Sequence, residues 1–278
     1  MQAFRPPPSN CRITEPGIAA RLSCFGFGER NVDAETNALG QPVGAMVTGW
    51  TPPARPSREP LQGSYCRLEP LDPVRHSGSL YEADRADVDG GSWTYLPYGP
   101  FSTLESYVEW CVKSAASQDP LFFSILDHAS ARAIGIASYL RIDPANGSIE
   151  IGHLHFSPLL QRTTAATEAL YLLMKRAFQL GYRRLEWKCN ALNAQSRRAA
   201  ERLGLSFEGI FRQATVVKGR NRDTAWYAAI DSEWPHLRAA FEVWLDSSNF
   251  ESTGVQKVSL SNLTRPIRHA ASAQSSEE

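Results

Sequence analysis

The spacing of apolar residues changes from two to 3.6 and back to two across residues 148–189. Residues 148–156 alternate as a half-buried strand does, and residues 184–189 form a second short β-prone run. Between them, apolar residues recur with the helical period at Ala166, Leu170, Leu173, Ala177 and Leu180. Gly181 can end this helix, which we expect from about residue 163 to residue 180. The pattern predicts a βαβ unit at the centre of the folded part of the chain.

Further strands and helices flank this unit. The strands that we expect cover residues 65–71, 121–126, 133–142, 206–217 and 223–230. The expected helices cover residues 73–86, 102–117, a segment capped by Asn193 and ended by Gly204, and 233–245. Turn signals separate the strands between residues 121 and 156, which is typical of an antiparallel meander. The order of elements predicts a mixed αβ domain.

The two ends of the chain differ in composition from its middle. Half of the 18 prolines fall in residues 1–60, where they favour extended conformations, and the last 25 residues or so are rich in Ser, Asn and Ala. The organisation that we predict is, in chain order, a disordered extension (1–36), an extended Pro-rich arm packed on the domain (37–60), the folded domain (61–235), a C-terminal helix (236–250) and a flexible tail (251–278).

Composition and missing motifs exclude several classes of protein. The chain has equal numbers of basic and acidic residues, 29 each, which argues against electrostatic binding of nucleic acid over its whole surface. No window approaches the roughly 18 apolar residues of a membrane span, so we expect a cytoplasmic protein without a membrane partner. The five cysteines are scattered without a CxxC pair, and neither a Walker loop nor an HExxH helix is present. No metal is required by these patterns.

Residues 150–169 read EIGHLHFSPLLQRTTAATEA, and residues 193–204 begin with NAQS and end with ERLG. Together with the aromatic loop at 93–101, these segments resemble the GNAT superfamily of acyl-CoA-dependent N-acyltransferases, in its RimJ/RimL-type branch. The resemblance covers about residues 39–250. It implies a central, mostly antiparallel, splayed sheet of about six or seven strands with helices on both faces. It also implies acetyl-CoA as the co-substrate, with its pantetheine arm in the gap where two strands splay apart.

The turn before the long helix is the expected pyrophosphate site. A strand that runs through a short turn into a helix aims unpaired N–H groups and the positive end of the helix dipole at one point. Here these donors belong to residues 162–166, and Arg162, Thr163 and Thr164 add a charge and two hydroxyls. The family's turn usually has glycine at the position of Thr164. The Thr164 side chain therefore leaves less room for the pyrophosphate of CoA to approach the backbone. The resemblance assigns further cofactor contacts to Phe156, Gln161, Ala165, Ala166 and Asn193.

Acyl transfer to an amine needs a base, because a free amine is mostly protonated at neutral pH. The resemblance makes Glu150, on the strand before the turn, the leading candidate for this base. His153 and His155 are rivals of opposite strand parity, unless a bulge intervenes, so that only one set can face the cleft. The resemblance also places Ser196 near the thioester sulfur as a proton donor. The alternative for Asn193 and Ser196 is a plain helix cap.

The acceptor side of the cleft is expected at the aromatic loop. Tyr95 and Tyr98 have polar ends and are our candidates for substrate contact, whereas Trp93 and Phe101 suit a hydrophobic plug. The basic run at residues 218–223 reads either as a solvated turn or as a counter-charge for an acidic substrate or the 3′-phosphate of CoA.

The predicted activity is transfer of an acetyl group from acetyl-CoA to a primary amine, by direct attack in a ternary complex. The amine belongs to a protein or peptide N-terminus in this interpretation, and a small metabolite amine is the alternative acceptor. A non-catalytic acyl-CoA- or protein-binding module on the same fold is a further alternative, because a fold alone does not establish an activity. We expect a monomer or homodimer that binds no nucleic acid.

Overall fold

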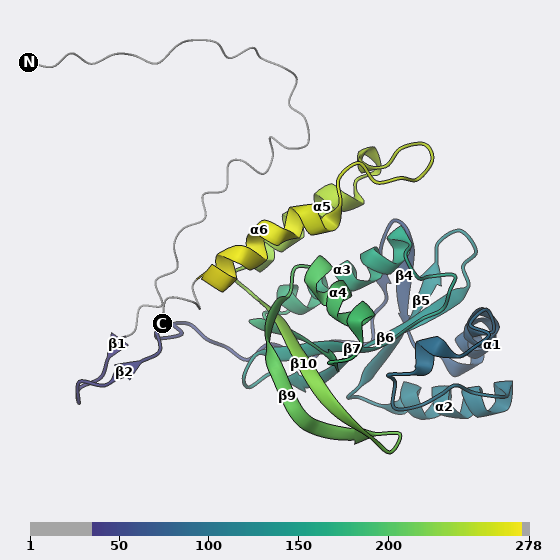
Figure 1. Cartoon of the computed structure of the whole chain (residues 1–278), viewed down its shortest axis with the longest axis horizontal. Helices are drawn as coiled ribbons and strands as arrows, with labels where there is room; N and C mark the ends of the chain where they lie inside the picture. Colours follow the sequence, from purple (N-terminus) through teal and green to yellow (C-terminus); the bar gives the residue numbers. More distant parts are fainter. Residues whose placement is uncertain (1–34, 274–278) are drawn as a thin grey trace, which may run out of the picture. The chain divides into compact units, whose positions relative to one another are not determined.

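A computed structural model describes residues 35–273 of the chain (Figure 1). It divides into two compact units at Met46. The described part of the first unit is a small hairpin of β1 (Glu35–Thr36) and β2 (Pro42–Val43). All other elements belong to the second unit. Except for Glu35 and Thr36, the predicted N-terminal extension lies outside the described residues.

One eight-stranded sheet forms the centre of the second unit, in the order β3-β4-β5-β6-β7-β8-β10-β9. Its strands are β3 (Leu61–Gln62), β4 (Cys66–Pro70), β5 (Leu121–Asp127), β6 (Ala133–Asp143), β7 (Ser148–Phe156), β8 (Arg184–Asn190), β9 (Ser206–Val217) and β10 (Arg220–Ile230). Neighbouring strands are antiparallel except β7 and β8, which are parallel. The parallel pair follows from the crossover through the helix between them.

Helices cover both faces of this sheet (Figure 1). The long helix α3 (Thr164–Gln179) packs against β4, β7 and β8 on one face, whereas α1 (Pro73–Asp84) and α2 (Leu104–Ala116) contact β6 and β5 on the other. The remaining helices are α4 (Ala194–Arg202), α5 (Trp234–Leu245), α6 (Leu260–Ala273) and two short turns, η2 (Gly91–Trp93) and η3 (Ser247–Asn249). No helix within residues 35–273 is both long and apolar enough to cross a bilayer.

The alternation along β5 explains how one sheet serves two cores. Leu121, Phe123 and Ile125 point to the α3 face, while Phe122 and Leu126 belong to the cluster under α1 and α2. All five side chains are buried, so this strand has no solvent face and reads as a continuous apolar run. The buried sheet provides a rigid platform on which the strand ends and turns of the site are positioned.

The predicted fold class is confirmed, with one more strand than expected. The sheet is mostly antiparallel and carries helices on both faces. The additional strand is β3, whose two residues are too few to produce an alternating pattern. β10 begins at Arg220, three residues before the predicted start at residue 223, because Lys218 and Gly219 take positive φ angles in a tight turn between β9 and β10.

The predicted flexible tail at 251–278 is wrong for half of its length, because residues 260–273 form α6. Leu260 and Thr264 are fully buried, Ile267 is nearly so, and the Thr264 hydroxyl donates to the Arg202 carbonyl oxygen over 3.1 Å. These residues recur at helical spacing on one face, but the Ser- and Asn-rich composition hid that stripe. Residues 274–278 lie outside the described part of the chain.

Candidate functional site

The gap between β7 and β8 is the central feature of the site. The two strands pair at only three positions, the last being Glu150 with Glu186. Beyond that point β7 pairs with β6 alone, and β8 pairs with β10. The β8-facing edge of β7 therefore loses its strand partner from Ile151 onward, which leaves backbone donors and acceptors free for another molecule.

A β-bulge at His153 determines which side chains face the same way. His153 has a φ of 49°, and the register advances three residues on β7 for two on β6 between Gly152 and His155. The additional residue brings His155 onto the same face as Glu150. The bulge that we named as the exception to simple parity is thus present, and Glu150 and His155 both point toward the α1 and α2 side of the sheet.

Glu150 is buried at the point where the strands separate. Its side chain is 3% exposed, and its carboxylate lies 2.8 Å from Arg141 Nη1 and 3.1 Å from Lys188 Nζ. Burial raises the pKa of Glu150 above its ordinary value, although Arg141 and Lys188 act in the opposite direction. The site thus holds a carboxylate that attracts a proton more strongly than an exposed glutamate does.

The charges around Glu150 form a continuous network across the two strands. The Lys188 ammonium, 7% exposed, also contacts Glu186 at 2.7 Å and lies 3.7 Å from the ring centroid of Trp226. Arg184 forms a salt bridge of 2.8 Å with the other carboxylate oxygen of Glu186. Because Lys188 sits between two carboxylates, it positions Glu150 at the mouth of the gap.

The turn between β7 and α3 has the geometry of an anion site. The Thr163 hydroxyl caps α3 by accepting from the Ala166 amide at 3.1 Å, and Arg162 takes the left-handed conformation with a φ of 61°. Within the described part of the chain, the amides of Arg162, Thr164 and Ala165 donate to no other group. These donors and the Arg162 charge fit a pyrophosphate. Thr164 is the first helical residue and is only half-buried, while Ala165 and Ala166 are buried.

Gln161 holds the turn to the end of β7. Its side-chain amide donates to the Phe156 carbonyl oxygen over 2.8 Å. Phe156 itself is half-buried and packs against the core on the α3 side. These two predicted cofactor residues therefore shape the turn, and their contact with a cofactor stays a prediction.

Asn193 and Ser196 lie at the start of α4, in the segment that follows β8. The Asn193 side-chain oxygen accepts from the Ser196 amide at 3.0 Å, which is the cap that we named as the alternative. The Ser196 hydroxyl oxygen accepts from Trp187 Nε1 at 3.0 Å. A hydroxyl that accepts from an N–H keeps its own hydrogen for another acceptor. The cap and a catalytic role for Ser196 are therefore compatible.

Both candidate tyrosines of the aromatic loop use their hydroxyls within the protein. Tyr95 donates to the Leu192 carbonyl oxygen at 3.3 Å, and the Tyr98 hydroxyl lies 3.1 Å from His153 Nδ1, with the two rings stacked. Trp93 is buried and packs edge-on against Phe101, as a hydrophobic plug would. Hydrogen bonds therefore connect the aromatic loop to the bulge at His153 and to the segment before α4.

Lys218, at the tip of the β9–β10 hairpin, fastens the same loop from the far side. Its ammonium donates to the carbonyl oxygens of Trp93 and Gly99, each at 2.9 Å. This contact is neither the solvated turn nor the counter-charge that the basic run at residues 218–223 predicts. The acceptors of the Lys218 ammonium are backbone carbonyl oxygens more than 100 residues away along the chain, so no pattern of side chains could predict them.

Residues 68–206, half of the chain, match the profile of a family described as Acetyltransferase (GNAT) domain. The chain belongs to this GNAT family. The solved structure of a GCN5-related N-acetyltransferase from Brucella melitensis is 47% identical, with a TM-score of 0.77, and the match covers 79% of this chain and 100% of that one. A probable GNAT acetyltransferase from Chromobacterium violaceum ATCC 12472 is 41% identical, with a TM-score of 0.65, over 70% and 98% of the two chains.

The Ribosomal-protein-serine acetyltransferase of Escherichia coli (strain K12) is 35% identical over 98 residues. This match covers 35% of the present chain and 54% of the relative, so it spans about half the relative's length. It supports the RimJ/RimL-type resemblance, and the predicted acyl-CoA-dependent N-acetyltransferase class is confirmed. Among the described residues, no three His, Cys, Asp or Glu side chains gather as a metal site would need.

Replacing Lys218 by methionine tests whether the loop contact orders the acceptor side of this GNAT protein. We expect KM for the amine to rise about fivefold or more, because two charge-assisted hydrogen bonds to the loop are lost while the apolar stem is kept. Affinity for acetyl-CoA should change less than twofold. Arg220→Met, on the same hairpin and exposed, is the matched control. An unchanged KM in the Lys218 variant would show that the contact is irrelevant to the acceptor.

Proposed function

We propose that the protein transfers the acetyl group of acetyl-CoA to a protein or peptide N-terminal amine, with Glu150 as the base. The observation that carries this proposal is the buried Glu150 carboxylate where β7 and β8 separate. The free amides at the start of α3 support binding of a phosphate-bearing substrate at the same gap. Both features belong to one strand–turn–helix segment, which is the arrangement that an acyl-CoA acyltransferase needs.

The chemistry assigned to Glu150 follows from the protonation states of the groups near it. Burial lowers the pKa of His153 to about 4 and that of His155 to about 3, so both rings are neutral but weak bases at pH 7. Burial acts in the opposite direction on Glu150, whose raised pKa makes the carboxylate a stronger base. Glu150 is therefore the group best suited to take a proton from an ammonium.

The proposed transfer forms one C–N bond and breaks one C–S bond. The protonated amine gives its first proton to Glu150, and the nitrogen lone pair then attacks the thioester carbonyl carbon. Free backbone amides on the exposed edge of β7 are candidates to stabilise the oxyanion. When the C–S electron pair leaves with sulfur, the Ser196 hydroxyl protonates the thiolate. The second proton lost by nitrogen restores Ser196, and the first leaves Glu150 for solvent.

The acceptor class rests on the likeness to the ribosomal-protein-serine acetyltransferase. A second candidate, a small amine, is favoured by the way the aromatic loop is fastened. Tyr95 and Lys218 tie it to the segment before α4 and to the β9–β10 hairpin, which narrows the approach that a peptide would need. We place the N-terminal amine first, because the name of this relative specifies a protein substrate.

The first experiment is a calorimetric titration of the purified protein with acetyl-CoA and with CoA, followed by thiol-release assays. The acceptors are a short peptide that begins with serine and a panel of small primary amines. We expect one-to-one binding and faster turnover of the peptide. Faster turnover of the small amines would support the second candidate. Binding without turnover of any amine would favour a non-catalytic module, and absence of binding up to millimolar acetyl-CoA would contradict the proposal.

Arg162 offers a separate test of the pyrophosphate site. Its left-handed backbone conformation costs a non-glycine residue about 1 kcal/mol, so Arg162→Gly should raise the free energy of unfolding by about that amount. The same change removes a positive charge and should weaken acetyl-CoA binding about tenfold. Arg162→Ala is the matched control, because it loses the charge but keeps the strained conformation. Urea denaturation and calorimetry check the two effects, and unchanged affinity in both variants would remove Arg162 from the site.

A further inference from the structure

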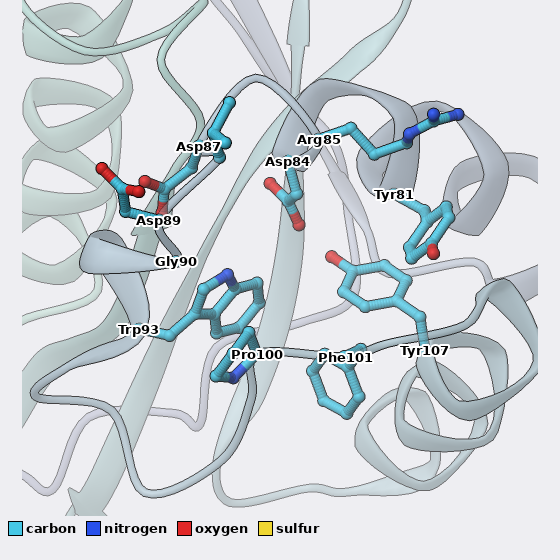
Figure 2. Close-up of a pocket in the computed structure, with 11 residues that line it drawn as sticks. Tyr81, Asp84, Arg85, Asp87, Asp89, Gly90, Trp93, Pro100, Phe101 and Tyr107 are labelled. Atoms are coloured by element: carbon cyan, nitrogen blue, oxygen red, sulfur yellow. The ribbon is translucent and has the colours of Figure 1, made fainter.

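A pocket of ≈ 380 Å³ lies between α1, the loop before η2 and α2, on the α1 side of the sheet (Figure 2). Four aromatic residues line it, namely Tyr81, Trp93, Phe101 and Tyr107. Three acidic residues, Asp84, Asp87 and Asp89, also line it, against Arg85 as the single base. The pocket shares none of its lining residues with the α3 turn or with the network around Glu150. Its lining is aromatic and acidic.

Asp84 projects into this pocket, and the Tyr107 hydroxyl points toward its carboxylate (Figure 2). Its side chain is 9% exposed, and among the described residues no donor, the Tyr107 hydroxyl included, reaches hydrogen-bond geometry with either carboxylate oxygen. Arg85 does not neutralise it, since its guanidinium points away in Figure 2 and pairs with Glu82 at 3.5 Å. A buried carboxylate that completes no hydrogen bond is costly, and a bound cation is one way to offset that cost.

His155 Nδ1, which lies 3.4 Å from Asp84 Oδ1, cannot donate a proton to that oxygen. Asp87 accepts from the Ser92 hydroxyl at 2.6 Å, so the only hydrogen of that hydroxyl is used. Ser92 must then accept from His155 Nε2, which lies 2.9 Å away. The neutral His155 ring therefore carries its hydrogen on Nε2, and the bare Nδ1 faces Asp84 Oδ1 at 3.4 Å. Two lone pairs meet there unless Asp84 is protonated or a cation binds it.

We infer that this pocket binds a small organic cation, an ammonium or guanidinium group, with the Asp84 carboxylate as its counter-ion. The aromatic side chains supply ring faces and edges around that charge, and a ring face attracts a cation. Asp87 is already engaged by Ser92 and by the Gly91 amide, and Asp89 is exposed to solvent, so Asp84 is the buried anion that a bound cation would meet. An inorganic anion would be repelled by the three carboxylates.

The ionisation of Asp84 couples this binding to pH. Burial raises the pKa of Asp84 to about 7, so near neutral pH part of the protein carries a proton there, between the carboxylate and His155 Nδ1. The groups that face Asp84 are His155 from β7, Tyr107 and Cys111 from α2, and Asp87 from the loop. A bound cation displaces the proton, so affinity should rise as pH increases from 6 to 8.

The bound cation has two possible sources, which share one chemistry. It is either a positive side chain of the acetyl acceptor itself or a separate small molecule that occupies the pocket beside the catalytic gap. Trp93 connects the two regions, because its ring lines the pocket and stacks on His155 with centroids 3.5 Å apart. The inference does not depend on the proposed acetyl transfer, since binding can be measured without acetyl-CoA.

The test is calorimetric titration of the full chain with n-butylammonium at pH 6 and pH 8, with neutral n-butanol as the isosteric control. We expect saturable binding in the millimolar range that is at least fivefold tighter at pH 8, with release of a fraction of a proton seen by comparing two buffers at pH 7. Asp84→Asn should lose at least tenfold in affinity. Asp89→Asn, at the exposed rim of the same pocket, should change it less than threefold.

Equal affinity in the Asp84→Asn variant and the unaltered protein, or equal affinity at the two pH values, would overturn the inference. Circular dichroism of the Asp84→Asn variant shows that it is folded before binding is measured. Competition separates the two sources. If n-butylammonium raises KM for a peptide whose second residue is lysine but not for one with alanine there, the cation belongs to the acceptor. Binding without an effect on either peptide identifies a separate ligand.

Discussion

Replacing Glu150 by glutamine is expected to lower kcat about 100-fold or more, while acetyl-CoA affinity stays within twofold. General-base catalysis contributes about 10²–10⁴-fold, and the amide of glutamine cannot take the proton. The substitution keeps the size of the side chain, and its oxygen can still accept from Arg141 and Lys188. A loss in kcat without a loss of binding would therefore report the base itself. Single-turnover acetylation and calorimetry measure the two quantities.

The pH dependence makes this prediction specific. A base must be deprotonated, so the rate of the unaltered protein should fall as pH decreases through the raised pKa of Glu150. That acid limb should lie at a higher pH than an ordinary carboxyl gives, and it should vanish in the glutamine variant. Glu186→Gln is the matched control, because it alters the same Lys188 network but leaves Glu150 in place. An unchanged pH–rate profile in Glu150→Gln would remove Glu150 from the role.

The second large effect is expected at Glu168, one turn into α3. Its carboxylate accepts three backbone hydrogen bonds from the segment that leads from β3 into the first residue of β4. The donors are the amides of Ser64, at 2.7 Å, Tyr65, at 2.7 Å, and Cys66, at 2.8 Å. The two segments lie so close together that a Cβ added at Gly63 would clash with a Glu168 carboxylate oxygen. One buried side chain thus fixes α3 to the edge of the sheet.

Glu168→Gln should lower the free energy of unfolding by about 3 kcal/mol, because an NH₂ group would face backbone N–H donors and leave at least one of them unsatisfied. Urea denaturation with a fixed m-value measures the change. Glu242→Gln, an exposed carboxylate that pairs with Arg238, is the control and should cost less than about 1 kcal/mol. A loss below about 1 kcal/mol at Glu168 would show that the three bonds contribute little.

Local sequence patterns predicted most of the strands and helices of the fold. The alternating run at 148–156 became β7 with the predicted bounds, and the helical stripe predicted at about 163–180 became α3 at Thr164–Gln179. These elements form from their own periodicity and caps, so neighbours along the chain suffice to indicate them. The C-terminal helix α6 was not predicted, because its apolar residues are sparse. These residues become buried only through packing against α4 and α5, which the local sequence does not indicate.

At the candidate site, the order of segments is enough to place Glu150 on β7 and Arg162 and Thr163 in the turn that follows. Tertiary contacts are needed for the bulge at His153 that turns His155 to the face of Glu150, for the position of Lys188 between two carboxylates, and for the burial of Asp84. The difference lies in the distance along the chain over which each interaction acts. Capping and periodicity act over a few residues, whereas strand register, burial and charge pairing join segments that are distant along the chain.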